Sequence, residues 1–122
     1  MIEQLITYRR LVTLSDGIRV LIRLLVQADK PLLLALFAEA PETDLDQFRS
    51  DAGDPAVVAR WCDELDYGQV FPMVAVVNDK IVGDATLHMG ISYQRHIGWV
   101  RLYLDRGFRR RGIGGLMLSA LI

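Results

Sequence analysis

Two apolar runs open the chain, and a turn signal separates them. Residues 8–14 and 18–24 are rich in branched apolar side chains, and Ser15, Asp16 and Gly17 lie between them. An Asp-Gly pair between two such runs is typical of a tight hairpin turn. We therefore predict an antiparallel pair of strands at the start of the domain.

Two segments with a helical pattern come next. Asp29 precedes the apolar segment 32–40 and is a residue type that caps helices. Asp54 and Pro55 predict the start of a second helix. Its apolar residues recur at helical spacing and form one face: Val58, Trp61, Cys62 and Leu65. The polar stretch 41–55 is expected to be a loop within one domain.

The second half of the chain predicts three more strands and a last helix. Residues 71–77 and 80–89 flank Asn78-Asp79, two residues that tolerate the positive φ angles of a two-residue turn. Residues 96–104 predict the next strand, and residues 113–122 predict a helix. The expected fold is α/β, with a mixed, mostly antiparallel sheet flanked by helices.

Composition narrows the class of protein. The net charge of −1 gives no overall attraction to nucleic acid or to an anionic membrane. The single cysteine, Cys62, excludes an internal disulfide, and no Cys/His spacing predicts a metal site. No apolar run approaches the ~18 residues of a membrane span, and charged residues interrupt any signal-peptide pattern. We expect a cytoplasmic protein that uses no metal, nucleic acid or membrane.

Candidate chemistry concentrates in the segment FRRRGIGG, residues 108–115. It comes after a predicted strand and opens a predicted helix, whose first backbone N–H groups have no partner within the helix. Glycines let an anion approach the backbone, the helix dipole adds positive charge, and arginines add charged donors. The pattern favours a pyrophosphate or a similar anion. The alternative is a basic turn that only starts a helix.

Two common phosphate motifs do not fit this segment. A P-loop needs Gly-Lys followed by Ser or Thr, and no such sequence is present. A dinucleotide fingerprint needs a small residue where Met117 stands, and an acidic residue ~20 positions later. The stretch Arg109–Gly114 instead resembles the Arg/Gln-x-x-Gly-x-Gly/Ala signature of the GNAT family of N-acetyltransferases. The order of elements is also similar, since 96–104 resembles the family's fourth strand and 80–89 its third.

The resemblance implies a donor, a binding mode and a reaction. The co-substrate would be acetyl-CoA, and the residues that match the family's pyrophosphate site are Arg109, Arg110, Arg111, Gly112, Ile113, Gly114 and Gly115. Backbone groups of Leu102, Tyr103 and Leu104 would contact the pantetheine arm. The acceptor would be an amine, on a small molecule or on a protein, that attacks the thioester directly. A homodimer is left open.

The chain departs from the family pattern in two places. It stops inside the family's third helix, so we expect residues 1–122 to form one GNAT-like domain that lacks the fifth strand and the later elements of the family fold. That would leave an open sheet edge at 96–104 and puts the activity of this chain alone in question. The strand 96–104 also lacks the glutamate of many members and carries Trp99 and Arg101 instead. This favours, as the alternative, a CoA-binding or regulatory module without catalysis.

Catalytic residues are harder to assign. Asp84 and His88 are expected to share a strand face with Val82 and Thr86, and either is a weak candidate for a general base. The alternative is a polar sheet face. Tyr103 is a candidate acid, or else a tyrosine that packs across strands. Further candidates, with a solvated surface position as the alternative, are His96, Glu39, Glu42, Asp44 and Asp46.

Overall fold

The computed structural model describes residues 9–40, 54–65, 67, 70–92 and 95–121, without the side chains of 89–92, 95–99, 120 and 121. Five strands form one sheet in chain order, and each pairs antiparallel with the next. They are β1 (Arg9–Thr13), β2 (Arg19–Leu24), β3 (Val70–Val77), β4 (Lys80–Ser92) and β5 (Arg95–Leu104).

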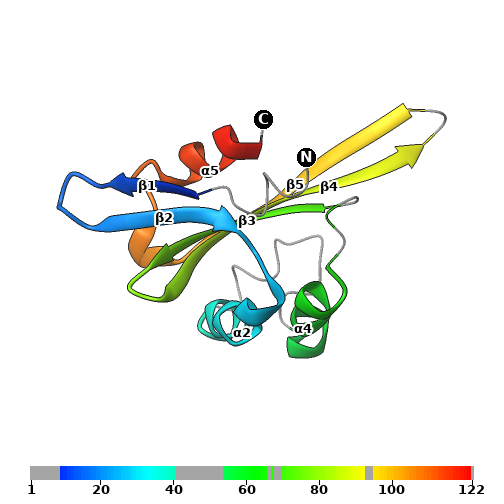
Figure 1. The fold of residues 1–122 in the computed structure, drawn as a ribbon, viewed down its shortest axis with the longest axis horizontal. Coiled ribbons are helices and arrows are strands. Elements are labelled where there is room, and N and C mark those ends of the chain that lie inside the picture. The colour runs from blue at the N-terminus through cyan, green and yellow to red at the C-terminus, as the bar shows by residue number, and fades with distance from the viewer. Residues whose placement is uncertain (1–8, 41–53, 66, 68–69, 93–94, 122) are drawn as a thin grey trace.

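Helices cover both faces of this sheet (Figure 1). Helices α2 (Lys30–Ala38) and α4 (Pro55–Asp63) lie on one face, and α5 (Ile113–Leu121) lies on the other. Two short 3-10 helices, η1 (Gln27–Asp29) and η2 (Arg106–Phe108), precede α2 and α5. The predicted fold class, an antiparallel sheet flanked by helices, is confirmed.

Residues with left-handed φ angles make the turns of two hairpins, as predicted. Gly17 has φ +88° in the β1–β2 turn, where the Leu14 amide donates to the Ile18 carbonyl at 2.8 Å. Asn78 and Asp79 have φ +49° and +61° between β3 and β4. Such angles match the right-handed twist of the paired strands.

The two predicted aspartate caps have different outcomes. Asp54 caps α4, because its carboxylate accepts the Ala56 amide at 2.9 Å. The prediction for Asp29 is wrong, since its side chain makes no capping hydrogen bond to α2. The carboxylate instead accepts the Val26 amide at 2.9 Å and both terminal nitrogens of Arg23 at 2.7 Å. Burial alone would raise the pKa of Asp29, but these hydrogen bonds hold it below its usual value.

The sheet separates two clusters of buried apolar side chains. The cluster beneath α5 includes Ile22, Met73, Ala75, Ile113 and Met117. The cluster beneath α2 and α4 includes Leu33, Phe37, Val58, Cys62 and Val74. Period-two alternation along the strands sends neighbouring residues to opposite clusters.

A bulge interrupts this alternation at the start of β4. Gly83 pairs with Ala75 and Ile81 pairs with Val76, so Val82 is an extra residue in the register. Val82 packs in the cluster beneath α5, on the face opposite Thr86, which lies in a pocket beside α4. The expectation that Val82 shares a face with the polar residues of this strand is therefore wrong.

Among the strands that the structure describes, β5 forms one edge of the sheet, as predicted. Val100 and Leu102 on this edge strand are 43% and 38% exposed. None of the described helices is both long and apolar enough to cross a membrane.

Candidate functional site

The arginine-glycine segment forms the connection between β5 and α5. Asp105 leaves β5 with its amide bonded to the Val82 carbonyl at 2.8 Å, and its carboxylate accepts the Gly107 amide at 2.9 Å. Arg109 then folds back, so that its Nε donates to the Leu104 carbonyl at 3.0 Å. Its guanidinium carbon lies 5.4 Å from the centre of the Tyr103 ring. The segment is thus held against the end of β5 before the helix begins.

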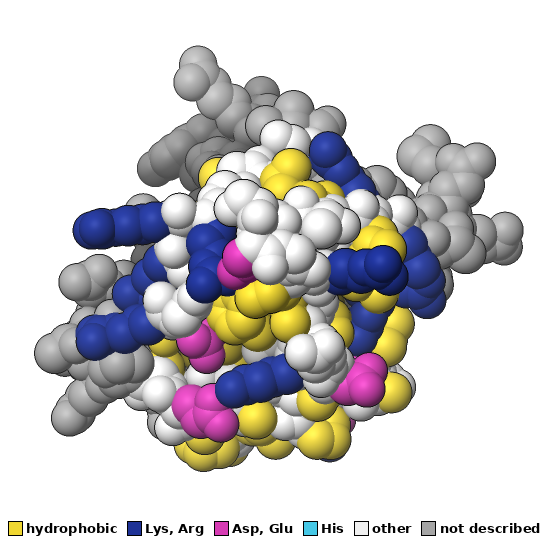
Figure 2. Space-filling model, turned by 90° about the vertical axis from the view of Figure 1, so that its left-hand side faces the viewer, with side chains coloured by type: hydrophobic (Ala, Val, Ile, Leu, Met, Phe, Trp, Pro, Cys, Tyr) yellow, Lys and Arg dark blue, Asp and Glu magenta, His cyan; other side chains and the backbone are white. Residues whose placement is uncertain are grey.

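Two left-handed residues turn the chain into α5. Arg110 has φ +62° and Gly112 has φ +81°, and the helix starts at Ile113, which is buried with Met117 against the sheet. The first amides of α5 therefore come directly after the turn, where a helix presents unpaired donors and positive dipole charge. Figure 2 shows Lys and Arg side chains gathered on the end of the molecule that carries the β1–β2 turn. This geometry suits an anion.

The three consecutive arginines have different surroundings. Arg110 is exposed. Arg111 reaches across to the first hairpin, where its Nη1 lies 2.8 Å from Asp16 Oδ2. That ion pair is more than a third exposed on both sides, so it contributes little to stability. It ties the β1–β2 turn to the segment 109–115, a contact between residues far apart in the sequence.

A pair of glycine substitutions tests whether the left-handed turn is required. Gly112→Ala is expected to lower the free energy of unfolding by about 1–2 kcal/mol, because an L-residue is strained at φ +81°. Gly115→Ala is expected to raise it by about 0.5–1 kcal/mol, because alanine is the better helix residue. Among the described atoms, none lies within 4 Å of a Cβ at either position, so packing does not confound the comparison. Urea denaturation followed by circular dichroism measures both, and equal shifts would contradict this interpretation.

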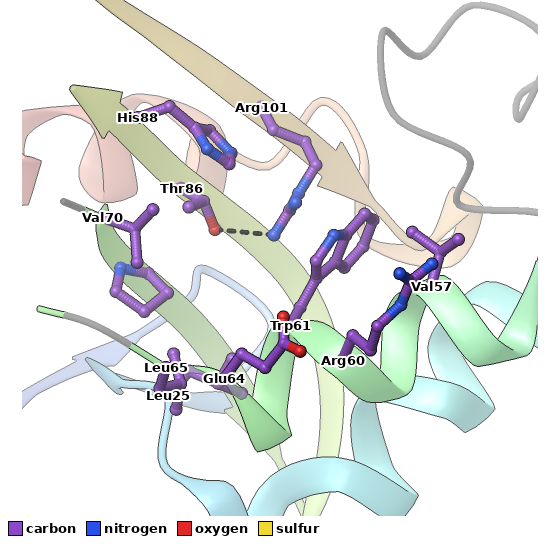
Figure 3. A pocket seen from close by; sticks show the side chains of 11 residues that line it. Leu25, Val57, Arg60, Trp61, Glu64, Leu65, Val70, Thr86, His88 and Arg101 are labelled. Atoms are coloured by element: carbon purple, nitrogen blue, oxygen red, sulfur yellow. Dashed lines mark hydrogen bonds between the residues drawn. The ribbon is translucent and has the colours of Figure 1, made fainter. Parts of the chain in front are cut away.

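The other face of the sheet carries a pocket of about 300 Å³. Figure 3 shows side chains from α4, β3, β4 and β5 around it. Its lining combines apolar and polar side chains: Leu25, Val57, Leu65, Val70, Pro72, Trp61, Arg60, Glu64, Thr86, His88 and Arg101. A concave site with a few convergent polar groups is the usual form of a small-molecule site.

A buried ion pair forms the polar wall of this pocket. Arg101 Nε donates to Asp84 Oδ2 at 2.7 Å, and the Arg101 and Asp84 side chains are 2% and 0% exposed. Thr86 Oγ1 donates to Asp84 Oδ1 at 2.6 Å and accepts from Arg101 Nη2 at 3.0 Å. The Arg101 guanidinium also stacks 3.7 Å from the centre of the Trp61 ring. Asp84 thus lies on a polar part of the sheet face, where Arg101 from β5 binds the carboxylate and Trp61 from α4 covers the guanidinium.

Sequence reasoning missed the Asp84–Arg101 pair, although a signal for it exists. Both residues occur singly among apolar neighbours on strands predicted to pair. Charged residues are almost never fully buried unless they are paired, so two opposite charges on adjacent buried strands indicate a partnership. The register that brings them together pairs Thr86 with Arg101 and Asp84 with Tyr103.

The two other catalytic candidates are placed differently. His88 lines the pocket; burial and the nearby Arg101 charge lower the pKa of its ring, so the imidazole is neutral near pH 7. Tyr103 is 5% exposed and packs beside Phe37, with ring centres 5.4 Å apart, so it matches the packing interpretation. Cys62 is buried, and burial raises the pKa of its thiol to about 11, which leaves it a poor nucleophile.

The remaining candidates contribute no described site. Glu39 forms an exposed ion pair with Lys80 at 2.9 Å. The predictions for Glu42, Asp44, Asp46 and the His96 side chain lie outside the described residues. Within the part of the chain that the structure describes, no group of three His, Cys, Asp or Glu side chains is arranged to hold a metal ion.

Comparison with known families decides the relationship. The model of the acetyltransferase (GNAT) family matches residues 33–122. The chain belongs to this family. The segment 109–115 thus lies in a GNAT domain, as its resemblance to the family signature predicted. No curated protein sequence is significantly similar to this chain.

Solved structures show the same fold. The GNAT domain of S. lividans PAT has a TM-score of 0.74 and 15% identity, over 91% of this chain and 68% of that chain. A ribosomal-protein-S5-alanine acetyltransferase from Vibrio fischeri has a TM-score of 0.68 and 18% identity, over 84% and 61%. A predicted acetyltransferase from Clostridium acetobutylicum, solved with acetyl-CoA, has a TM-score of 0.57 and 18% identity, over 84% and 70%. This chain thus spans between 61% and 70% of these structures, and the likeness concerns the fold.

Proposed function

We propose that this GNAT domain binds acetyl-CoA and serves an N-acetyltransferase that moves the acetyl group to an amine. The observation that carries the proposal is the left-handed turn at Arg110 and Gly112, which delivers the chain to the start of α5. Helix N-termini with glycine and arginine are suited to phosphate groups. The acetyl-CoA bound to the structural neighbour from C. acetobutylicum supports this choice of donor.

The proposed acetyl-CoA site includes the edge strand β5 as well as the turn at 109–115. The residues proposed for the pantetheine arm, Leu102, Tyr103 and Leu104, form the last part of β5, immediately before η2. An edge strand presents backbone N–H and C=O groups that an extended ligand can pair with. The side chain of Leu102 is 38% exposed on this strand, which gives an apolar surface beside those groups.

The two substrates define the reaction. The amine nitrogen attacks the thioester carbonyl carbon, a C–N bond forms, and the C–S bond breaks. The nitrogen loses one proton and the departing thiolate gains one, so the products are the N-acetyl compound and free CoA. Of the three catalytic candidates, His88 suits the base role, because it lines the pocket and is neutral near pH 7. Asp84 is held by Arg101 and Thr86 instead.

Calorimetric titration with CoA tests the proposal. Gly112→Glu places a carboxylate on the turn and is expected to weaken CoA binding by about tenfold or more, since like charges repel and ~1.4 kcal/mol corresponds to tenfold. Gly112→Ala reports the effect of backbone strain alone, and Ala38→Glu, an exposed position on α2, reports the effect of an added charge on the other face. Absence of CoA binding, or equal affinity in the Gly112→Glu variant, would overturn the proposal.

A second candidate is a CoA-binding module without catalysis. It is favoured by Arg101, which stands on the pocket side of β5 and is committed to a buried ion pair, where a carboxylate base would otherwise be expected. Release of free thiol from acetyl-CoA above background, measured with a panel of amines, would exclude this alternative.

A further inference from the structure

The Arg101 guanidinium has an unmet hydrogen-bond donor in the wall of the pocket. Nε is bonded to Asp84 at 2.7 Å, and Nη2 is bonded to Thr86 at 3.0 Å. Nη1 is buried, and none of the groups that the structure describes accepts a hydrogen bond from it. The side chain as a whole is only 2% exposed.

Such a donor is costly unless a partner completes it. A buried polar group without a partner loses its hydration and gains nothing in return, and the loss is larger for a charged group. The group cannot turn away, because Asp84 and Thr86 hold one edge of the guanidinium and Trp61 covers its plane at 3.7 Å. Arg101 also lines the pocket (Figure 3). A molecule that enters the pocket would therefore lie against this rigid side chain.

The lining indicates what this molecule carries. Guanidinium N–H groups form their strongest hydrogen bonds with the oxygens of ionised groups such as carboxylates and phosphates. Arg60 adds a second cation to the lining, while Glu64 is the lining residue that an ammonium group would approach. Leu65, Val70 and Pro72 supply an apolar wall for a carbon skeleton. A volume of about 300 Å³ suits a small molecule or a chain end.

We propose that the pocket binds the acceptor through a carboxylate that accepts a hydrogen bond from Arg101 Nη1. The acceptor class is then an amine that also bears a carboxylate, with an apolar body between pocket walls. This inference rests on the proposed function, because it takes the pocket to be the acceptor site. It selects amino acids and short peptides over polyamines and other purely cationic amines.

A ligand series on the unaltered chain tests the carboxylate without any risk of misfolding. Binding of leucine, leucinamide and 3-methylbutylamine is measured by NMR titration, with shifts at the pocket as the readout. Leucine is expected to bind about tenfold or more tightly than either analogue, since a charge-assisted hydrogen bond is lost in both. N-acetylleucine, which keeps the carboxylate and lacks the amine charge, is also expected to bind. Equal affinity across the series, or preference for 3-methylbutylamine, would overturn the inference.

Two further experiments show which residue binds the carboxylate and which kind of molecule carries it. Arg101→Lys keeps the charge but removes the Nη1 donor and is expected to abolish the preference for leucine over leucinamide. Arg19→Gln, at an exposed position on β2 outside the pocket lining, is the control and is expected to change that preference less than about threefold. A melting curve of each variant shows whether it is folded. Tighter binding of glycylleucine than leucine would assign the carboxylate to a peptide end, and the reverse order to a free amino acid. CoA titration of the same samples separates failure of this inference from failure of the proposed function.

Discussion

Replacing Asp84 with alanine is expected to lower the free energy of unfolding by about 3–5 kcal/mol, the usual cost of removing one partner from a buried ion pair. The substitution would leave the Arg101 cation, 2% exposed, without its carboxylate, and Thr86 without its acceptor. Both side chains are almost completely buried, so neither regains full hydration in the folded state. Urea denaturation followed by tryptophan fluorescence and circular dichroism would measure the loss.

Two companion variants show whether charge burial is the cause. Asp84→Val combined with Arg101→Met removes both charges and is expected to recover most of the stability, because an apolar pair of similar volume has no unpaired charge. Asp63→Ala removes the exposed ion pair with Lys30 and is expected to cost less than about 1 kcal/mol. If the double variant were as unstable as Asp84→Ala, lost packing rather than an unpaired charge would be the explanation.

Replacing Phe37 with alanine is expected to cost a similar amount, about 3–5 kcal/mol, through a cavity. Phe37 is 3% exposed and joins three elements. It lies edge-on to Trp61 of α4, with ring centres 5.7 Å apart, and beside Tyr103 of β5, with ring centres 5.4 Å apart. Its loss removes aromatic contacts that hold α2 to both partners.

The measurement for Phe37 has a built-in reporter and a control. Trp61 fluorescence is expected to shift in the folded state of Phe37→Ala, and the midpoint of urea unfolding is expected to fall. Leu11→Ala removes a side chain that is 61% exposed and is expected to change stability by less than about 0.5 kcal/mol. A Phe37→Ala variant as stable as Leu11→Ala would show that α2 does not depend on this aromatic cluster.

Local signals made much of the fold predictable from the sequence. Gly17, Asn78 and Asp79 predicted both hairpins because a tight turn depends only on φ angles that few residues adopt. Asp54 predicted the start of α4 because a cap involves residues two positions apart. The segment 109–115 could be placed between a strand and a helix because the patterns of the strand, the turn and the helix are also local in the sequence.

Features that depend on strand register could not be predicted from local signals alone. Asp84 and Arg101 meet because of the pairing of β4 with β5, which the residues themselves do not encode locally. The bulge that moves Val82 to the other face is also a property of the pair of strands. Asp29 had two possible partners, and the bidentate contact with Arg23 prevailed over the helix cap. The partner of Asp29 depends on where β2 ends, because Arg23 lies near the end of that strand.

The sheet carries one packed cluster of side chains on each face, and this arrangement affects which amino-acid substitutions such a protein can accept. The turn at 109–115 leads into α5 on one face, whereas the pocket beside Trp61 lies on the other. Arg109 beside Tyr103 is a point where the two sides meet. Substitutions in well-separated clusters usually have additive effects on stability, within ~0.5 kcal/mol. The residues of the pocket can therefore be exchanged while the turn and its helix stay unchanged, so one scaffold can keep the turn proposed for the donor while the pocket proposed for the acceptor diversifies.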